Sequence, residues 1–233
     1  MLLLTTAALP QLEQHRHPNL GRLITPRHHC RLADTLAAGY PVVADNDCFQ
    51  GFDPAAICAM LETVAPWPSV GARIRRAWPW AQPAWLENEP LAPAHPNLLW
   101  IAVPDLVGDA DATLERFREW HMPLCHLPLA FVLQDGAQRP GRVPWEAPGL
   151  AAVFVGGSTR WKLGPDAARL VRQARARGLH AHMGRVSTAR RIRYARSIGC
   201  TSFDSSRYSR WRERLLDDGL ARASQLPQLR LIP

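Results

Sequence analysis

Short apolar runs that each end at a polar residue or a glycine constrain the fold of this chain most strongly. Tyr40-Pro-Val-Val-Ala ends at Asp45, and Leu98-Leu-Trp-Ile-Ala-Val-Pro ends at Asp105. Stretches with helical patterns separate these runs, which is typical of parallel strands in an α/β protein. The carboxyl ends of such strands lie on one face, where active sites form, so the pattern predicts an enzyme. The six endings are Asp45, Asp105, Gln134-Asp135-Gly136, Gly156-Gly157-Ser158, Gly184-Arg185 and Asp204.

The length of 233 residues suits one (β/α) barrel, or a smaller α/β domain with extensions. Strand and helix patterns alternate without a break, which favours a single domain with a parallel sheet. We expect a catalytic domain over residues 22–233, preceded by a lead-in segment over residues 1–21. Residues 66–97 are rich in proline and tryptophan, and they form either a lid or a loosely structured excursion.

The chain is strongly basic, with a formal net charge of +8. Lys162 is the sole lysine among 28 lysine and arginine residues. A nucleic acid is the expected partner, because guanidinium groups bind phosphates in a bidentate manner; a solvated basic surface is the alternative. Arg207, Arg210 and Arg212 follow Asp204 closely, so we expect them to hold a polyanionic substrate.

The five cysteines include no Cys-x-x-Cys pair, and the histidines lack zinc-ligand spacing to them. We therefore expect reduced thiols, no metal and no cofactor. No apolar run approaches the roughly 18 residues of a membrane span, and the N-terminus lacks the basic region of a signal peptide. The expected location is the cytoplasm, without membrane contact.

Two carboxylates are candidates for catalysis. Asp45 ends a strand, and the helix that follows already has a cap in Asp53, so Asp45 is available as a general base. Asp204 ends another strand and has the chemistry to attack a sugar carbon as a nucleophile. Each has a structural alternative, a capping turn for Asp45 and an Asx-turn for Asp204.

The other strand ends supply candidate binding groups. Asp105 and Gln134-Asp135 suit the edge of a base, although each also fits a helix cap or a turn. Gly156-Gly157 lets the backbone approach a flat ligand, or forms a tight turn. Arg185 suits a phosphate or the backbone of a substrate. His182, inside its strand, is interpreted as a buried core histidine.

In their order and spacing, these motifs resemble the tRNA-guanine transglycosylase superfamily, and most closely its DNA-acting, DpdA-like branch, which inserts 7-deazaguanines into DNA. The similarity covers residues 22–210. The family's Asp-Ser-Gly-Gly-Phe-Gln motif is similar to Asp45-Asn46-Asp47-Cys48-Phe49-Gln50. Its other motifs are similar to Leu133-Gln134-Asp135-Gly136 (Val-Gln-Gly), Gly156-Gly157 (Gly-Gly), Met183-Gly184 (Met-Gly), Phe203-Asp204 (Phe-Asp) and Asp105 (the base-binding Asp).

The resemblance implies a (β/α)8 TIM-type barrel that exchanges a base at C1′ of the sugar. Asp204 would form a covalent glycosyl-enzyme intermediate, and Asp45 would handle the proton of the departing guanine and of the incoming base. The target base must leave the duplex stack, which costs a few kcal/mol. The substrate-binding residues that the resemblance implies are Asp105, Gln134, Asp135, Gly156, Gly157, Met183, Gly184 and Arg185.

Two departures from the family pattern affect these expectations. The Cys-x-Cys-x-x-Cys…His zinc module of the tRNA enzymes has no counterpart, so DNA is the expected polymer and tRNA the less favoured one. Asp47-Cys48 replaces two glycines, which changes one wall of the pocket. Two alternatives stay open: a nucleoside or N-glycoside hydrolase that uses the same carboxylates, and a non-catalytic nucleic-acid-binding barrel subunit.

Overall fold

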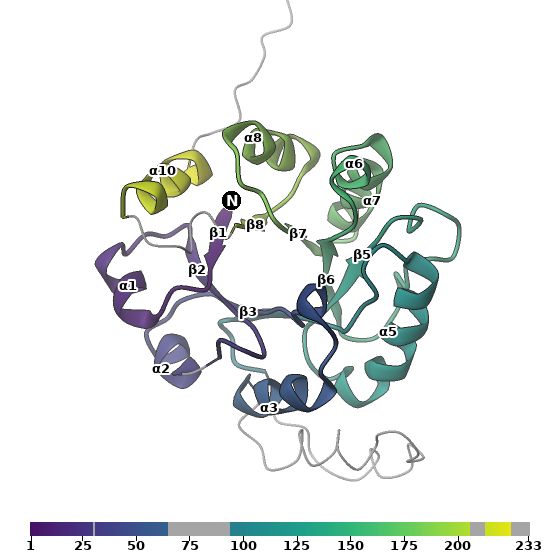
Figure 1. The fold of residues 1–233 in the computed structure, drawn as a ribbon, viewed down its shortest axis with the longest axis horizontal. Helices are drawn as coiled ribbons and strands as arrows, with labels where there is room; N and C mark the ends of the chain where they lie inside the picture. The colour runs from purple at the N-terminus through teal and green to yellow at the C-terminus, as the bar shows by residue number, and fades with distance from the viewer. Residues whose placement is uncertain (30, 65–93, 206–212, 225–233) are drawn as a thin grey trace, which may run out of the picture.

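Eight parallel strands close into a barrel in the computed structural model, which describes residues 1–29, 31–64, 94–205 and 213–224 (Figure 1). The strands pair in sequence order, and β8 pairs with β1 to complete the ring. The strands are β1 (Leu2–Thr5), β2 (Leu20–Ile24), β3 (Val42–Ala44), β4 (Leu98–Ala102), β5 (Leu129–Leu133), β6 (Leu150–Val155), β7 (His180–Met183) and β8 (Ser202–Asp204).

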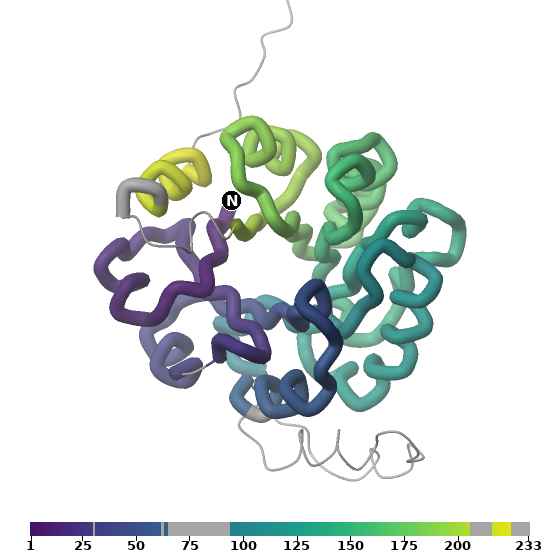
Figure 2. The backbone as a smooth tube through the Cα atoms, in the orientation of Figure 1, coloured from purple at the N-terminus to yellow at the C-terminus, as the bar shows by residue number. Residues whose placement is uncertain are grey.

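Helices alternate with the strands and form the outer layer of the barrel, as the tube in Figure 2 shows. This alternation confirms the predicted (β/α)8 TIM-type barrel. A short 3-10 helix, η1 (Cys48–Gln50), lies directly after β3. The α-helices of the described residues are α1 (Leu9–Gln14), α2 (Leu32–Ala37), α3 (Pro54–Val64), α5 (Ala110–Leu124), α6 (Thr159–Lys162), α7 (Pro165–Ala176), α8 (Ala189–Ile198) and α10 (Glu213–Ser224).

The first strand corrects the boundary expected at residue 22. Leu3 of β1 pairs with Leu20 of β2 and with Phe203 of β8, so residues 1–21 contain a barrel strand and helix α1. The prediction of a lead-in segment is therefore wrong. The apolar run of β1 is followed by Thr5-Thr6 and lacks the acid, amide, glycine or arginine that ends the six runs on which the prediction is based.

Two acids outside the candidate site, Asp109 and Asp53, act as helix N-caps. Asp109 accepts hydrogen bonds from two backbone N–H groups at the start of α5. Asp53 accepts one from the N–H of Ala56 at the start of α3, at 3.1 Å. Because these two residues cap the helices, Asp45 and Asp105 are not needed as helix caps.

Successive side chains along each strand point alternately inward and outward, so they form two separate apolar layers. The outer layer lies between the strands and the helices. Each fully buried leucine or valine in these layers stabilises the fold by about 1.5–3 kcal/mol. Because side chains fill the barrel interior, a ligand has to bind at one end of the barrel. The inner layer comprises Leu4, Leu23, Val43, Trp100, Ala102, Ala130, Val132 and Ala152.

Two predicted features lie outside the described residues. Of the Pro/Trp-rich stretch at 66–97 only residues 94–97 are described, and Arg207, Arg210 and Arg212 are not. Across the parts of the chain that the structure does describe, no helix combines the length and the apolarity needed to cross a membrane.

Candidate active site

The carboxyl ends of the strands surround a cavity of about 780 Å³. Since side chains alternate along a strand, the residue two places after an inward apolar side chain also points inward. This rule directs Asp45 inward after Val43, and Gln134 inward after Val132. The volume accommodates a nucleoside-sized ligand. The predicted site residues that line this cavity are Asp45, Asp105, Gln134, Gly156, Arg185 and Asp204.

Asp204 is held from one side by two hydrogen-bond donors. Its Oδ1 lies 3.0 Å from His182 Nε2 and accepts the backbone N–H of Arg185 at 3.2 Å. Within the described part of the chain, Oδ2 accepts no hydrogen bond, and the side chain is 23% exposed to the cavity. One oxygen is therefore fixed by the protein while the other faces the space where a substrate would bind.

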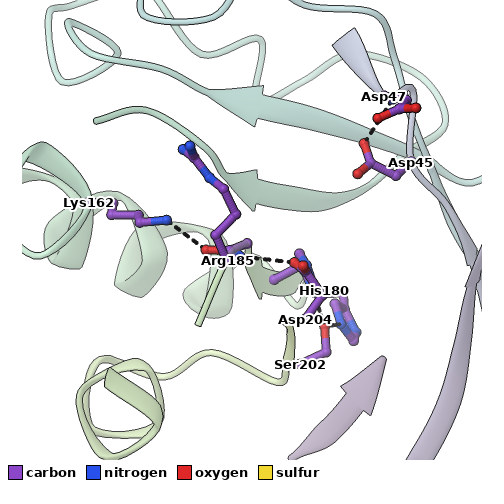
Figure 3. Close-up of polar contacts among 9 residues, drawn as sticks. Asp45, Asp47, Lys162, His180, Arg185, Ser202 and Asp204 are labelled. Atoms are coloured by element: carbon purple, nitrogen blue, oxygen red, sulfur yellow. Dashed lines mark hydrogen bonds and ion pairs between the residues drawn. The ribbon is translucent and has the colours of Figure 1, made fainter. Parts of the chain in front are cut away.

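A chain of hydrogen bonds leads from Asp204 into the barrel (Figure 3). His182 Nδ1 lies 2.8 Å from the Ser202 hydroxyl, which lies 2.7 Å from His180 Nε2. An ionised Asp204 only accepts, so we assign the hydrogen of His182 to Nε2 and let its Nδ1 accept from Ser202. Burial lowers the pKa of His182, and the hydrogen bond and charge of Asp204 oppose this shift. Burial, followed by the nearby His182, lowers the pKa of His180 to about 3, so burial favours the neutral form of both imidazoles.

Aromatic rings hold the imidazole of His182 in place. The Phe154 ring stacks on it with centroids 4.7 Å apart. The ring of Trp100, which belongs to the inner layer, has its centroid 5.1 Å from that of the imidazole. His182 is 0% exposed, so the interpretation as a buried core histidine is confirmed. That interpretation omitted the contact with Asp204, which gives the same side chain a place in the candidate site.

Asp45 lies in the same cavity in a different environment. Burial, followed by the negative charges of Asp204 and Asp105, raises the pKa of Asp45 to about 7. The backbone N–H of Asp47 donates to Asp45 Oδ1 at 3.3 Å and opposes this shift. A carboxyl group with a pKa near neutrality both takes up and releases a proton at physiological pH, which suits an acid–base catalyst.

Asp105 is a buried acceptor braced by two amides. Its Oδ1 accepts from Asn46 Nδ2 at 2.8 Å, and its Oδ2 accepts from Gln134 Nε2 at 2.6 Å. Burial raises the pKa of Asp105, and these two hydrogen bonds oppose the rise. A carboxylate offers about four acceptor positions, so Asp105 keeps acceptor capacity for the N–H groups of a base edge.

Gln134 connects Asp105 to two loops at the mouth of the barrel. Its Oε1 accepts the backbone N–H groups of Gly108 and Gly157, each at 2.9 Å. A Cβ at Gly156 would lie 2.8 Å from Gln134 Nε2, so this close approach requires glycine. The N–H of Gly157 is already engaged by Gln134. Gly156 lines the cavity, and the binding of a base by the Gly156-Gly157 backbone stays a prediction.

Four predicted binding residues do not line the cavity: Asp135, Gly157, Met183 and Gly184. For Asp135 and Met183 the structure shows other contacts, so their predicted contacts with substrate are corrected. The Asp135 carboxylate accepts the N–H and the hydroxyl of Ser158, both at 2.6 Å, and so holds the loop after β6. Met183 is 0% exposed and belongs to the outer layer, because it alternates with the inward residues of β7. Asp135 therefore stabilises a loop, and Met183 stabilises the core.

Arg185 lies at the mouth of the cavity, with the backbone in the left-handed region at φ 58°. Its Nη2 donates to the carbonyl of Gly157 at 2.6 Å, and its guanidinium lies 4.7 Å from the centroid of the Phe49 ring. Phe49 is 60% exposed. Gly184, just before it, packs so closely against Phe154 that a Cβ would lie 2.8 Å from Cζ of that ring.

Three residues support the candidate site without a role of their own assigned from the sequence: Asn46, which was named only within the motif that follows β3, His180 and Ser202. For the last two, the alternation along β7 and β8 is the available signal, since it directs them to the same interior as His182 and Asp204. Asn46 follows an inward residue, so alternation gave no reason to direct it to Asp105. Among the described residues, no three His, Cys, Asp or Glu side chains gather closely enough to hold a metal ion.

No family model and no curated protein matches the chain. Among solved structures, it is similar to the Bacillus subtilis YkuI protein, with an EAL domain, in complex with substrate c-di-GMP and calcium. The identity is 14% and the TM-score 0.30, over 89% of this chain and 44% of that chain, so this chain spans less than half of that protein. The fold class, a (β/α)8 barrel, therefore rests on the strand topology of this chain itself.

Proposed function

We propose that this chain is a base-exchanging glycosyltransferase that replaces guanine in DNA by a 7-deazaguanine. The observation that carries the proposal is the pair of unlike carboxylates in one cavity. Asp204 accepts two hydrogen bonds on one oxygen, whereas Asp45 has a pKa raised to about 7 by burial and by its acidic neighbours. Unlike environments for two carboxylates assign one as nucleophile and the other as acid–base catalyst.

The first half of the reaction is the departure of guanine. An Asp204 carboxylate oxygen attacks C1′, and the bond from C1′ to N9 breaks as the new C1′–O bond forms. Asp45, in its protonated form, gives its proton to the departing base. The products of this step are free guanine, ionised Asp45 and a glycosyl ester on Asp204.

The second half reverses these roles. Asp45 removes the proton of the incoming base, whose nitrogen attacks C1′ and displaces Asp204. Both carboxylates then return to their starting states. The Nε2–H of His182 and the N–H of Arg185 hold Oδ1 of Asp204; they orient the carboxylate toward C1′ for the attack and receive it again on its release.

Recognition of the base fits the remaining side chains of the cavity. The buried Asp105 carboxylate is oriented by Asn46 and Gln134, and it accepts from the adjacent N–H groups that guanine and 7-deazaguanines share. The exposed ring of Phe49 and the guanidinium of Arg185 lie at the mouth of the cavity, where the polymer would enter. The net charge of +8 favours a polyanionic substrate.

The proposal is tested by exchange of radiolabelled guanine, a reaction that can be measured whichever base is the natural one. The protein is incubated with labelled guanine and with either duplex DNA, single-stranded DNA or tRNA. We expect label in DNA with the wild type and none with Asp204→Asn, whereas the control Asp109→Asn at the cap of α5 keeps the activity. Label in tRNA alone would correct the polymer, and release of guanine from DNA without incorporation would favour the hydrolase.

A further inference from the structure

Lys162 is the sole lysine of the chain, and it is buried. It ends the short helix α6 after the Gly156-Gly157 loop, and it is 1% exposed. Lysines are almost never fully buried unless a partner compensates the lost hydration. Arginine fills every other basic position of the chain, so a compact ammonium group at this place calls for a structural reason.

The ammonium group of Lys162 donates to a backbone carbonyl. Its Nζ lies 2.7 Å from the oxygen of Gly184. Figure 3 draws this hydrogen bond as the dashed line that leaves Lys162. Burial, followed by the charge of Arg185, lowers the pKa of Lys162 to about 8, with a smaller effect of Arg191 in the same direction. The charge of Asp204 opposes this shift, so the nucleophile lies close enough to act on Lys162.

The same peptide bond contacts Asp204 from its other end. The carbonyl of Gly184 and the N–H of Arg185 belong to one planar unit, in which they point in opposite directions. The carbonyl accepts from Lys162, and the N–H donates to Asp204 Oδ1 at 3.2 Å. A rotation of this peptide would replace the donor by a carbonyl oxygen that repels the carboxylate.

The backbone at this turn needs such an anchor. Arg185 has a φ of 58°, a conformation that costs a non-glycine residue roughly 1–2 kcal/mol. Its side chain donates to the carbonyl of Gly157, so Lys162 and Arg185 tie the loops after β6 and β7 to each other in both directions. The two contacts select one orientation of the peptide.

We propose that Lys162 is a positioning residue for Asp204, which fixes the Gly184 carbonyl and thereby keeps the N–H of Arg185 directed at the nucleophile. This inference rests on the proposed role of Asp204 in glycosyl transfer. Lys162 does not line the cavity, so it acts on the reaction through the peptide and not by contact with the substrate.

The test compares Lys162→Met, which keeps the length of the side chain and removes the ammonium group, with Arg169→Met. Arg169 lies exposed on α7, where it pairs with Asp166 at 3.1 Å. We expect Lys162→Met to slow formation of the covalent complex on saturating DNA by about tenfold or more, because the nucleophile is no longer held in position, with the half-saturating DNA concentration unchanged within about twofold. Arg169→Met should match the wild type. A folded Lys162→Met protein with the wild-type rate would overturn the inference.

A second measurement needs neither the activity nor this variant. With lysine labelled by ¹³C at the ε carbon, the protein gives one side-chain signal, because Lys162 is its sole lysine. We expect that signal to titrate near pH 8 in the wild type and at lower pH in Asp204→Asn, because the charge of Asp204 supports the ammonium form. Equal midpoints in the two proteins would overturn the coupling. If the wild type forms no covalent complex, the proposed function fails, whereas the titration still decides the coupling.

Discussion

Replacing Asp45 by asparagine should stabilise the protein more at pH 8 than at pH 5. At pH 8 the folded wild type contains an ionised, buried Asp45, which lowers its free energy of unfolding. The pKa of Asp45 rises from 3.8 to about 7 on folding. A raised folded-state pKa in an acid destabilises the fold as the pH increases through the interval between the two values. The cost is absent well below pH 3.8 and complete above pH 7.

The size of the effect follows from the shift. About three pKa units at about 1.4 kcal/mol each give a cost of roughly 4 kcal/mol at pH 8. At pH 5 the unfolded carboxyl is ionised and the folded one is not, which leaves a cost of under about 2 kcal/mol. The stabilisation by Asp45→Asn should therefore be about 2 to 3 kcal/mol larger at pH 8 than at pH 5.

The assay is urea denaturation of both proteins at both pH values. Comparing two pH values cancels any constant effect of the amide on packing. Asp109→Asn makes the same change at an exposed helix cap, where asparagine caps as well as aspartate, and it should differ from the wild type by less than about 0.5 kcal/mol at each pH. An Asp45→Asn effect of equal size at pH 5 and pH 8 would refute the reasoning about the buried charge.

Two further variants test the surroundings of the carboxylates. His182→Phe keeps an aromatic ring against Phe154 and Trp100 but removes the donor that holds Asp204 Oδ1 in place. Because a misplaced reacting group can cost about 100-fold in rate, single-turnover formation of the covalent complex should slow by roughly 10- to 100-fold, and an unchanged rate would remove His182 from the site. Gly156→Ala places a Cβ 2.8 Å from Gln134 Nε2 and should displace that amide from Asp105. Calorimetry should then show that guanine binds about tenfold more weakly. Wild-type affinity would show that Gln134 does not set the shape of the base site.

The barrel class could be predicted from the sequence because six short apolar runs alternate with helical patterns, and each run ends at a polar residue or a glycine. The sequence also placed Asp45 and Asp204 correctly at strand ends, and alternation along the strand then directs both into the cavity. It did not predict β1, whose apolar run is followed by Thr5-Thr6 and lacks the acid, amide, glycine or arginine that ends the other runs. It assigned Met183 to substrate binding, although alternation directs that side chain to the outer layer.

The supporting contacts depend on tertiary structure and were not accessible from the sequence. Asn46 reaches Asp105 across 59 positions of the chain, and Ser202 reaches His182 across 20. Lys162 is conspicuous in the sequence as the sole lysine, but its burial and its contact with Gly184 arise only when the loops after β6 and β7 meet.

The proposed mechanism requires that Asp204 becomes covalently bound to C1′ of the substrate sugar. This bond is detected by mass spectrometry of the denatured protein after incubation with a DNA oligonucleotide, followed by mapping of the modified peptide. We expect an adduct of one oligonucleotide without its guanine, attached at Asp204 and lost in Asp204→Asn. An adduct on Asp45, or base exchange that proceeds without any adduct in the wild type, would contradict the mechanism.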